Sequence, residues 1–171
     1  MSSCTYDFIF ITETWTNSDI PNSILRLNYY YDLLRDDRLD KRGGGVLIFF
    51  RKSLQIVNVE IPEGLKISET LAFDLILKHQ KIRFLLVYRS PKCDEIQNDK
   101  LCNLLSWIYT SSIQSIVLGD FNYPLIRWNN TPISEQSPDF KFYTTICDLG
   151  YYQYVTHPTL KNNIRSHFCI E

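Results

Sequence analysis

The segment Val117-Leu118-Gly119-Asp120-Phe121-Asn122 decides how the rest of the chain is interpreted. A mostly apolar run, residues 115–118, predicts a buried strand that ends at Gly119, where the backbone can turn or a ligand can approach closely. Residues two apart on an extended backbone point to the same side, so we expect Asp120 and Asn122 to converge on one target. A carboxylate beside a carboxamide suits a phosphate ester activated by Mg²⁺. Both residues are also common turn formers, which is the structural alternative.

Length and composition indicate one globular domain, residues 1–171, with 44% hydrophobic and 22% charged residues. The formal net charge is −1, so no overall positive field attracts a polyanion. A nucleic-acid substrate therefore requires local arginines and lysines. The candidates are Arg35, Arg38, Lys41, Arg42, Arg51, Lys52 and Arg89.

The five cysteines form no C-x-x-C pair, which argues against a structural zinc site and favours reduced thiols. The apolar run near the N-terminus, residues 8–11, is far shorter than a membrane span. It also lacks the basic flank of a signal peptide. We therefore expect a cytoplasmic or nuclear protein with no membrane association.

Hydrophobic periodicity predicts strands alternating with two helices, an order that indicates an α/β sandwich around mixed sheets. Residues 6–11 look like a strand buried on both faces, and residues 16–40 look irregular. Two hairpins are expected, one pairing 46–50 with 54–59 and the other pairing 69–77 with 82–88. Helices are expected at 92–110 and 138–149, and a strand-like piece follows residue 151.

Polar side chains follow several of the expected strands. Glu13 comes after the first, Tyr88 and Arg89 close the fifth, and Asp120 and Asn122 follow the sixth. Side chains gathered at one sheet edge commonly build α/β sites. Glu13 would hold Mg²⁺, and Tyr88 or Arg89 would donate to phosphate oxygens. Structural alternatives remain for each: a loop cap for Glu13, a core aromatic for Tyr88 and a surface cation for Arg89.

Four motifs occur in order: Ile11-Thr12-Glu13-Thr14-Trp15, Gly43-Gly44-Gly45-Val46, Val87-Tyr88-Arg89-Ser90-Pro91 and Leu118-Gly119-Asp120-Phe121-Asn122. With the later segment 149–159, they resemble the endonuclease/exonuclease/phosphatase superfamily. The resemblance is to the endonuclease domain of non-LTR (jockey-like and LINE) retrotransposons. It implies a DNase I-like, four-layer α/β sandwich with mixed, mainly antiparallel sheets. It also implies Mg²⁺-dependent nicking of DNA to prime reverse transcription, with Mn²⁺ as the alternative ion and a fused reverse transcriptase as a former partner.

The resemblance also implies roles for individual residues. Glu13 would bind the metal, Tyr88 would contact phosphate, and Asp120 and Asn122 would orient the nucleophile and the phosphate. Arg89, Asn122 and Thr159 would bind substrate.

The sequence departs from the family pattern near both ends. Only five residues precede Tyr6, where the family has an Asn-bearing strand. Residues 164–168 have no Asp where the family has one, and no Ser-Asp-His motif follows. We therefore expect a domain truncated at both ends with edge strands missing, and we do not expect His79, His157 or His167 to be catalytic. Three functions remain open: an endonuclease, a non-catalytic remnant or co-opted nucleic-acid-binding module, and a phosphatase of small phosphoesters or lipids. The residues of the four motifs match the retrotransposon branch, which disfavours the phosphatase.

Overall fold

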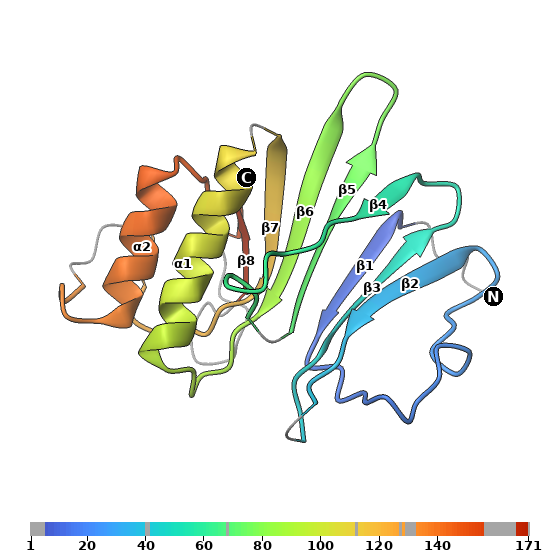
Figure 1. Ribbon diagram of the computed structural model, residues 1–171, viewed down its shortest axis with the longest axis horizontal. Coiled ribbons are helices and arrows are strands. Elements are labelled where there is room, and N and C mark those ends of the chain that lie inside the picture. Colours follow the sequence, from blue (N-terminus) through green and yellow to red (C-terminus); the bar gives the residue numbers. More distant parts are fainter. Residues whose placement is uncertain are drawn as a thin grey trace.

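In the computed structural model, the chain forms two facing β-sheets and a pair of helices (Figure 1). The structure describes residues 6–39, 42–67, 69–111, 113–126, 128, 133–155 and the backbone of 167–170. The expected α/β sandwich is confirmed. Within the described residues it has three layers: the helices, the five-stranded sheet and the three-stranded sheet.

The larger sheet has the order β4-β5-β6-β7-β8. Its strands are β4 (Ile56–Asn58), β5 (Thr70–Ile76), β6 (Lys81–Tyr88), β7 (Gln114–Asp120) and β8 (His167–Ile170). Only the β6–β7 pairing is parallel, which confirms a mixed, mainly antiparallel sheet. The hairpin expected between the fourth and fifth strands is confirmed as β5–β6.

The smaller sheet has the order β1-β3-β2, from β1 (Phe8–Thr12), β3 (Val46–Arg51) and β2 (Tyr31–Asp36). Two expectations were wrong here. Residues 31–36 form a strand inside the segment expected to be irregular. Its apolar centre is only Leu33-Leu34 with charged residues on both sides, which is too short for a recognisable hydrophobic pattern. Strand β3 does not form a hairpin with β4: it is the central strand between β1 and β2, and β4 pairs with β5 in the other sheet.

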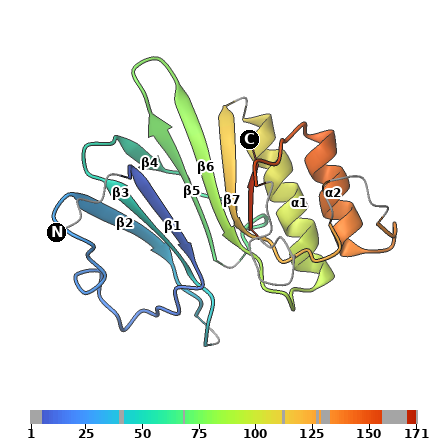
Figure 2. The same ribbon diagram turned by 180° about the vertical axis from the view of Figure 1, so that it is seen from behind.

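Strand β1 lies at an edge of its sheet and is only half-buried along most of its length, so the expectation of burial on both faces was wrong (Figure 2). Its inward side chains, Phe8 and Phe10, meet the larger sheet. Phe73 and Phe84 from that sheet stack with ring centroids 5.0 Å apart, and Phe8 lies 5.5 Å and 5.2 Å from them. These aromatic rings fill the core between the two sheets.

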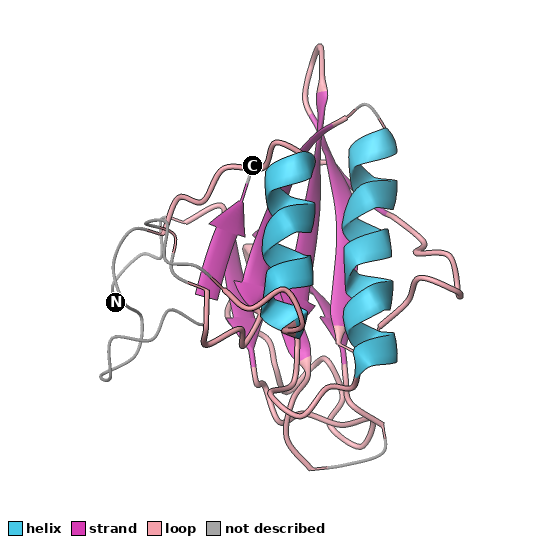
Figure 3. Ribbon diagram, turned by 90° about the vertical axis from the view of Figure 1, so that its left-hand side faces the viewer, coloured by secondary structure: helices cyan, strands magenta, loops and turns pink. Residues whose placement is uncertain are grey.

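Both helices cover the other face of the larger sheet and lie side by side (Figure 3). Helix α1 (Glu95–Thr110) begins at Asp94, whose carboxylate accepts from Gln97 N at 2.8 Å, a standard N-cap. Helix α2 (Pro138–Asp148) places proline in its first turn, where no amide donor is needed. Neither helix combines the length and apolar character that a bilayer span requires, within the part of the chain described.

Candidate active site

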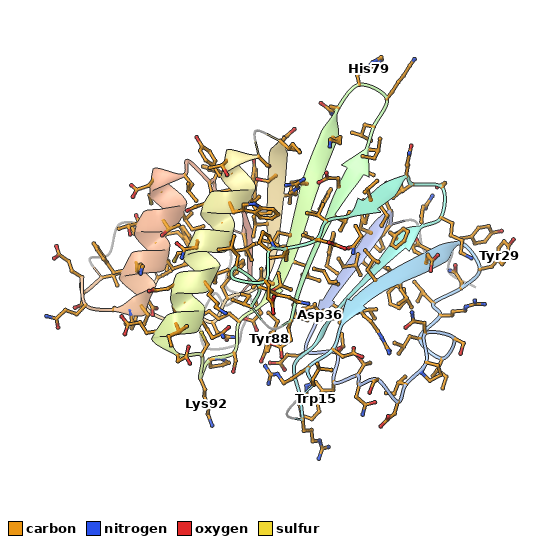
Figure 4. All side chains as sticks on the ribbon, viewed as in Figure 1. Trp15, Tyr29, Asp36, His79, Tyr88 and Lys92 are labelled. Carbon is orange, nitrogen blue, oxygen red and sulfur yellow. The ribbon has the colours of Figure 1, made fainter. Side chains whose placement is uncertain are left out.

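The strand ends named by the sequence motifs meet at one end of the molecule. Trp15, Asp36 and Tyr88 lie there together, whereas His79 occupies a hairpin turn at the opposite end (Figure 4). Strand β1 ends beside the start of β3, and β6 and β7 run parallel so that Tyr88 is opposite Asp120. The expected gathering of side chains from several strands is therefore present in the backbone arrangement.

Glu13 and Tyr88 join the two sheets. The Tyr88 hydroxyl donates to Glu13 Oε1 at 2.7 Å. Burial raises the pKa of Tyr88, and the hydrogen bond to Glu13 raises it further because ionisation would place two negative charges together. Tyr88 therefore stays a protonated donor, and its partner is a carboxylate on an exposed residue.

A second acid, Glu69, is linked to Tyr88 through Arg38 and through its own backbone carbonyl. Its side chain is 1% exposed and forms a salt bridge with Arg38, whose guanidinium lies 5.6 Å from the centre of the Tyr88 ring. The hydrogen bond to Glu69 raises the pKa of Arg38. The Glu69 carbonyl also accepts from Tyr88 N at 3.0 Å. Sequence reasoning missed Glu69, since the only signal was an acid at the start of a buried strand.

Gly119 lies inside β7 and serves close packing between strands. A Cβ added there would lie 1.8 Å from the carbonyl oxygen of Val87 in β6. The strand continues through Asp120, so Gly119 does not turn the chain, and that expectation was wrong. Asp120 is 8% exposed at the end of the strand.

Asn122 is not on extended backbone, because its φ is +50°. The premise that Asp120 and Asn122 share a side through an i, i+2 relation was therefore wrong. The Asn122 side-chain nitrogen donates to the Arg89 carbonyl at 2.8 Å, which ties the turn after β7 to the end of β6.

Arg89 lies under this turn and is 6% exposed, so it is not the surface cation of the structural alternative. Its Nη1 donates to the carbonyls of Phe121 at 3.1 Å and Asn122 at 2.9 Å. Its Nε donates to Asn98 Oδ1 at 2.7 Å, and its guanidinium lies 4.0 Å from the centre of the Tyr123 ring. The guanidinium thus links α1, β6 and the turn that follows Asp120.

Backbone strain is concentrated in the same region. In the described part of the chain, four non-glycine residues have φ near +50° to +57°: Glu13, Trp15, Glu69 and Asn122. Left-handed backbone is costly for such residues and collects at functional sites. All four belong to motifs or contacts that surround Tyr88.

A cavity of about 520 Å³ opens beside Tyr88 and Arg89. Its lining combines cations and anions, among them Arg38, Lys66 and Lys92 with Glu69 and Asp94. Neither Glu13 nor Asp120 lines this cavity, so it lies beside the group of motif residues and not among them.

No cluster of three His, Cys, Asp or Glu side chains gathers in the described residues. Mg²⁺ does not need such a cluster, because it keeps several waters and is held by one or two carboxylates plus substrate phosphate. Glu13 has one carboxylate oxygen engaged by Tyr88 and is otherwise exposed. This donor fits a magnesium ion. Thr159 and His157 lie outside the described residues, and His167 is described only as the backbone partner of Asp120 in β8.

The sequence model of one protein family, the Endonuclease/Exonuclease/phosphatase family, matches residues 2–165 of this chain. Comparison with curated proteins gave no match.

Several solved structures share the fold. The endonuclease domain of TRAS1, a telomere-specific non-LTR retrotransposon, superposes with a TM-score of 0.70 at 11% identity, over 96% of this chain and 71% of that one. The 3′-5′ exonuclease NExo from Neisseria meningitidis superposes with a TM-score of 0.63 at 14% identity, over 96% of this chain and 75% of that one. An AP endonuclease from Archaeoglobus fulgidus gives 0.58 at 14% identity, again over 96% and 75%. At such identities the likeness concerns the fold.

Proposed function

The chain belongs to the endonuclease/exonuclease/phosphatase family, and on that premise we propose that it is a Mg²⁺-dependent DNA endonuclease of retrotransposon origin. The observation that carries the proposal is the Tyr88–Glu13 contact. It joins a protonated phenol to an exposed carboxylate across two sheets, with Asp120 opposite Tyr88 on the adjacent strand. A hydrogen-bond donor for phosphate (Tyr88), a metal ligand (Glu13) and a second acid (Asp120) would then lie together where β6, β1 and β7 end.

In the proposed reaction, water attacks phosphorus and the bond from phosphorus to O3′ breaks. The products are a 3′-hydroxyl, which a reverse transcriptase can extend, and a 5′-phosphate. Asp120 accepts the proton of the attacking water, and Tyr88 donates to a phosphoryl oxygen. Glu13 would hold the ion, with Mn²⁺ as an alternative, and the bound ion would stabilise the charge on the phosphate and the leaving oxygen.

Arg89 and Asn122 take different parts. We propose that Arg89 holds the turn after β7 and does not contact phosphate, because its hydrogen bonds go to Asn98 and two backbone carbonyls. Asn122 and Thr159 remain proposed substrate contacts. The proposed DNA substrate implies action in the nucleus or cytoplasm. The ordered motifs support the retrotransposon origin, and with it an original fusion to a reverse transcriptase; the TRAS1 endonuclease domain shares the fold.

The test is conversion of supercoiled plasmid to open circles, with sealing by DNA ligase to confirm a 3′-hydroxyl and a 5′-phosphate. We expect Asp120→Ala to lower the nicking rate by about 10²–10⁴-fold, the usual effect of losing a general base. Glu13→Ala should abolish the nicking that Mg²⁺ supports. Asp19→Ala and Glu63→Ala, at exposed acids outside the site, are the matched controls.

A second candidate is a non-catalytic nucleic-acid-binding module. One observation favours it: His167 is the register partner of Asp120, at the place where the family pattern calls for an Asp. Binding of DNA without nicking in either Mg²⁺ or Mn²⁺ would support this function and refute the endonuclease.

A further inference from the structure

We propose that Trp15 and Arg42 form a stacking site for an unpaired nucleobase beside Glu13, which makes DNA with an unstacked nucleotide the preferred substrate. This inference rests on the proposed function, because it names the form of DNA that the same site takes. Trp15 has no role in the proposed reaction, and Arg42 was named only among the cations that could attract nucleic acid.

Trp15 is held close to the metal-binding residue. It follows Glu13 by two positions, so their Cα atoms are at most about 7.6 Å apart. Its backbone nitrogen donates to Gly44 O at 2.9 Å, and that of Thr14 donates to Gly45 O at 3.4 Å. These bonds fix the segment after β1 against the glycine turn that precedes β3.

The Trp15 side chain is 56% exposed, although indole is among the side chains that gain most from burial. One part of the ring packs along Gly43, where an added Cβ would lie 3.7 Å from Cε2. The residue also has a φ of +57°. An exposed tryptophan held in strained backbone next to a candidate catalytic carboxylate is better explained by a ligand than by packing.

Arg42 supplies the charge that nucleic acid requires. Its guanidinium lies 5.4 Å from the centre of the Trp15 ring, in the range of a cation–π contact. Guanidinium groups also bind phosphate and stack on planar rings. With a net charge of −1 on the chain, such local cations must provide the attraction for DNA.

The flat, half-exposed indole specifies the ligand. Bases within a duplex already stack on one another, so only an unpaired or extruded base can present its face to the ring. The ligand is therefore a nucleobase whose backbone phosphate reaches Arg42, next to the phosphodiester that Glu13 and Tyr88 would receive.

A similar pair provides the control. Lys52 lies 5.0 Å from the centre of the Tyr29 ring, and Tyr29 is 83% exposed. Tyr29 lies far from Tyr88 and Trp15, on another side of the molecule (Figure 4). The pair offers the same chemistry without a neighbouring site, so Tyr29→Ala should leave base stacking unchanged.

The experiment compares binding of a fully paired duplex with binding of the same duplex carrying a short bulge. The bulge contains a fluorescent adenine analogue that is quenched by stacking. Binding is measured by anisotropy in Ca²⁺, and nicking of both DNAs in Mg²⁺. We expect tighter binding and quenching of the bulged DNA. Trp15→Ala should weaken its binding by roughly 5- to 150-fold, the effect of losing one stacked base, and should leave the paired duplex unchanged.

Trp15→Phe should keep most of the preference, and Arg42→Ala should weaken it; both keep the proposal testable if Trp15→Ala fails to fold. Equal binding of the two DNAs by a chain that still nicks plasmid would overturn the stacking site and leave the endonuclease standing. Absence of DNA binding and nicking altogether would overturn both proposals.

Discussion

Replacing Arg89 with methionine removes the side-chain hydrogen bonds that link the turn after β7 to helix α1, whereas the bond from Asn122 to the backbone carbonyl of residue 89 stays. The guanidinium donates at 2.7 Å to Asn98 Oδ1, and at 3.1 Å and 2.9 Å to the carbonyls of Phe121 and Asn122. Methionine fills the space of the aliphatic stem but donates nothing. Three acceptors thus lose a charged donor in a region where Arg89 is 6% exposed, although Asn98 Oδ1 keeps the Tyr123 hydroxyl at 3.1 Å.

An acceptor left unsatisfied in a protein interior costs about 1–3 kcal/mol. Asn98 keeps its bonds from Tyr123 and Cys93, and Asn122 is half-exposed so that its carbonyl can regain water. We therefore expect Arg89→Met to lower the free energy of unfolding by about 2–4 kcal/mol, a large part of the about 5–15 kcal/mol of a typical domain. The measurement is urea unfolding followed by circular dichroism, extrapolated linearly to water.

Two further variants isolate the network. Asn98→Leu removes the acceptor on α1, and the double variant with Arg89→Met should show a coupling of about 1–3 kcal/mol, because the two residues are bonded directly. Lys92→Ala, at an exposed neighbour of Arg89, serves as the control and should change stability by less than about 0.5 kcal/mol.

The same variants separate positioning from substrate contact. If Arg89 holds the turn, Asn98→Leu should lower the plasmid-nicking rate without altering its salt dependence. If Arg89 contacts a phosphate, Asn98→Leu should have little effect, and Arg89→Met should reduce the salt slope of DNA binding. A stability loss below about 1 kcal/mol in Arg89→Met, with normal nicking by Asn98→Leu, refutes the reasoning.

Three other predictions concern single residues. Tyr88→Phe should lower the nicking rate roughly 10- to 100-fold. Since burial and the carboxylate partner raise the pKa of Tyr88, the phenol stays protonated, and the ratio of wild-type to variant rates should be flat between about pH 6 and 9. Asp74 accepts from Arg83 at 2.7 Å, which lowers the pKa of Asp74; its contribution to stability is therefore complete above the ordinary pKa of about 3.9 and lost as pH falls further. Asp74→Asn should flatten the loss of the urea midpoint below about pH 4 and destabilise the protein at neutral pH by about 3 kcal/mol, and an unchanged acid limb would contradict this. Gly119→Ala should destabilise by about 3 kcal/mol or more in thermal unfolding because its Cβ meets a β6 carbonyl, whereas Gly150→Ala, with φ +70° and open space around it, should cost only about 1 kcal/mol.

Elements set by local pattern could be predicted from the sequence. The β5–β6 hairpin follows from alternating residues and a short turn, and α1 from helical spacing behind the Asp94 cap. Strand β2 could not, because its ends carry charged residues that meet partners elsewhere, such as Asp36 accepting from Thr70 N at 3.0 Å. The partner of β3 was missed because its long apolar run reflects a central place between β1 and β2.

The candidate site divides in the same way. The strand-end positions of Glu13 and Tyr88 were enough to predict that they meet, and their side chains are in contact. The surroundings of Arg89 depend on Asn98 in α1 and on carbonyls more than thirty positions along the chain. No local pattern encodes those partners, so the sequence predicted a phosphate contact for Arg89, with a surface cation as the alternative, and gave no sign of its buried hydrogen bonds.

The contact between Glu13 and Tyr88 makes the distance between the two sheets a functional quantity. Tyr88 ends a strand of the larger sheet and Glu13 directly follows a strand of the smaller one, and phenylalanine rings fill the space between the two sheets. A smaller side chain at Phe73 would remove no polar group of the site, yet it would change the distance between the Tyr88 hydroxyl and the Glu13 carboxylate. If the proposed function holds, sequence variation in that aromatic layer would tune metal affinity and nicking rate from a position between the sheets.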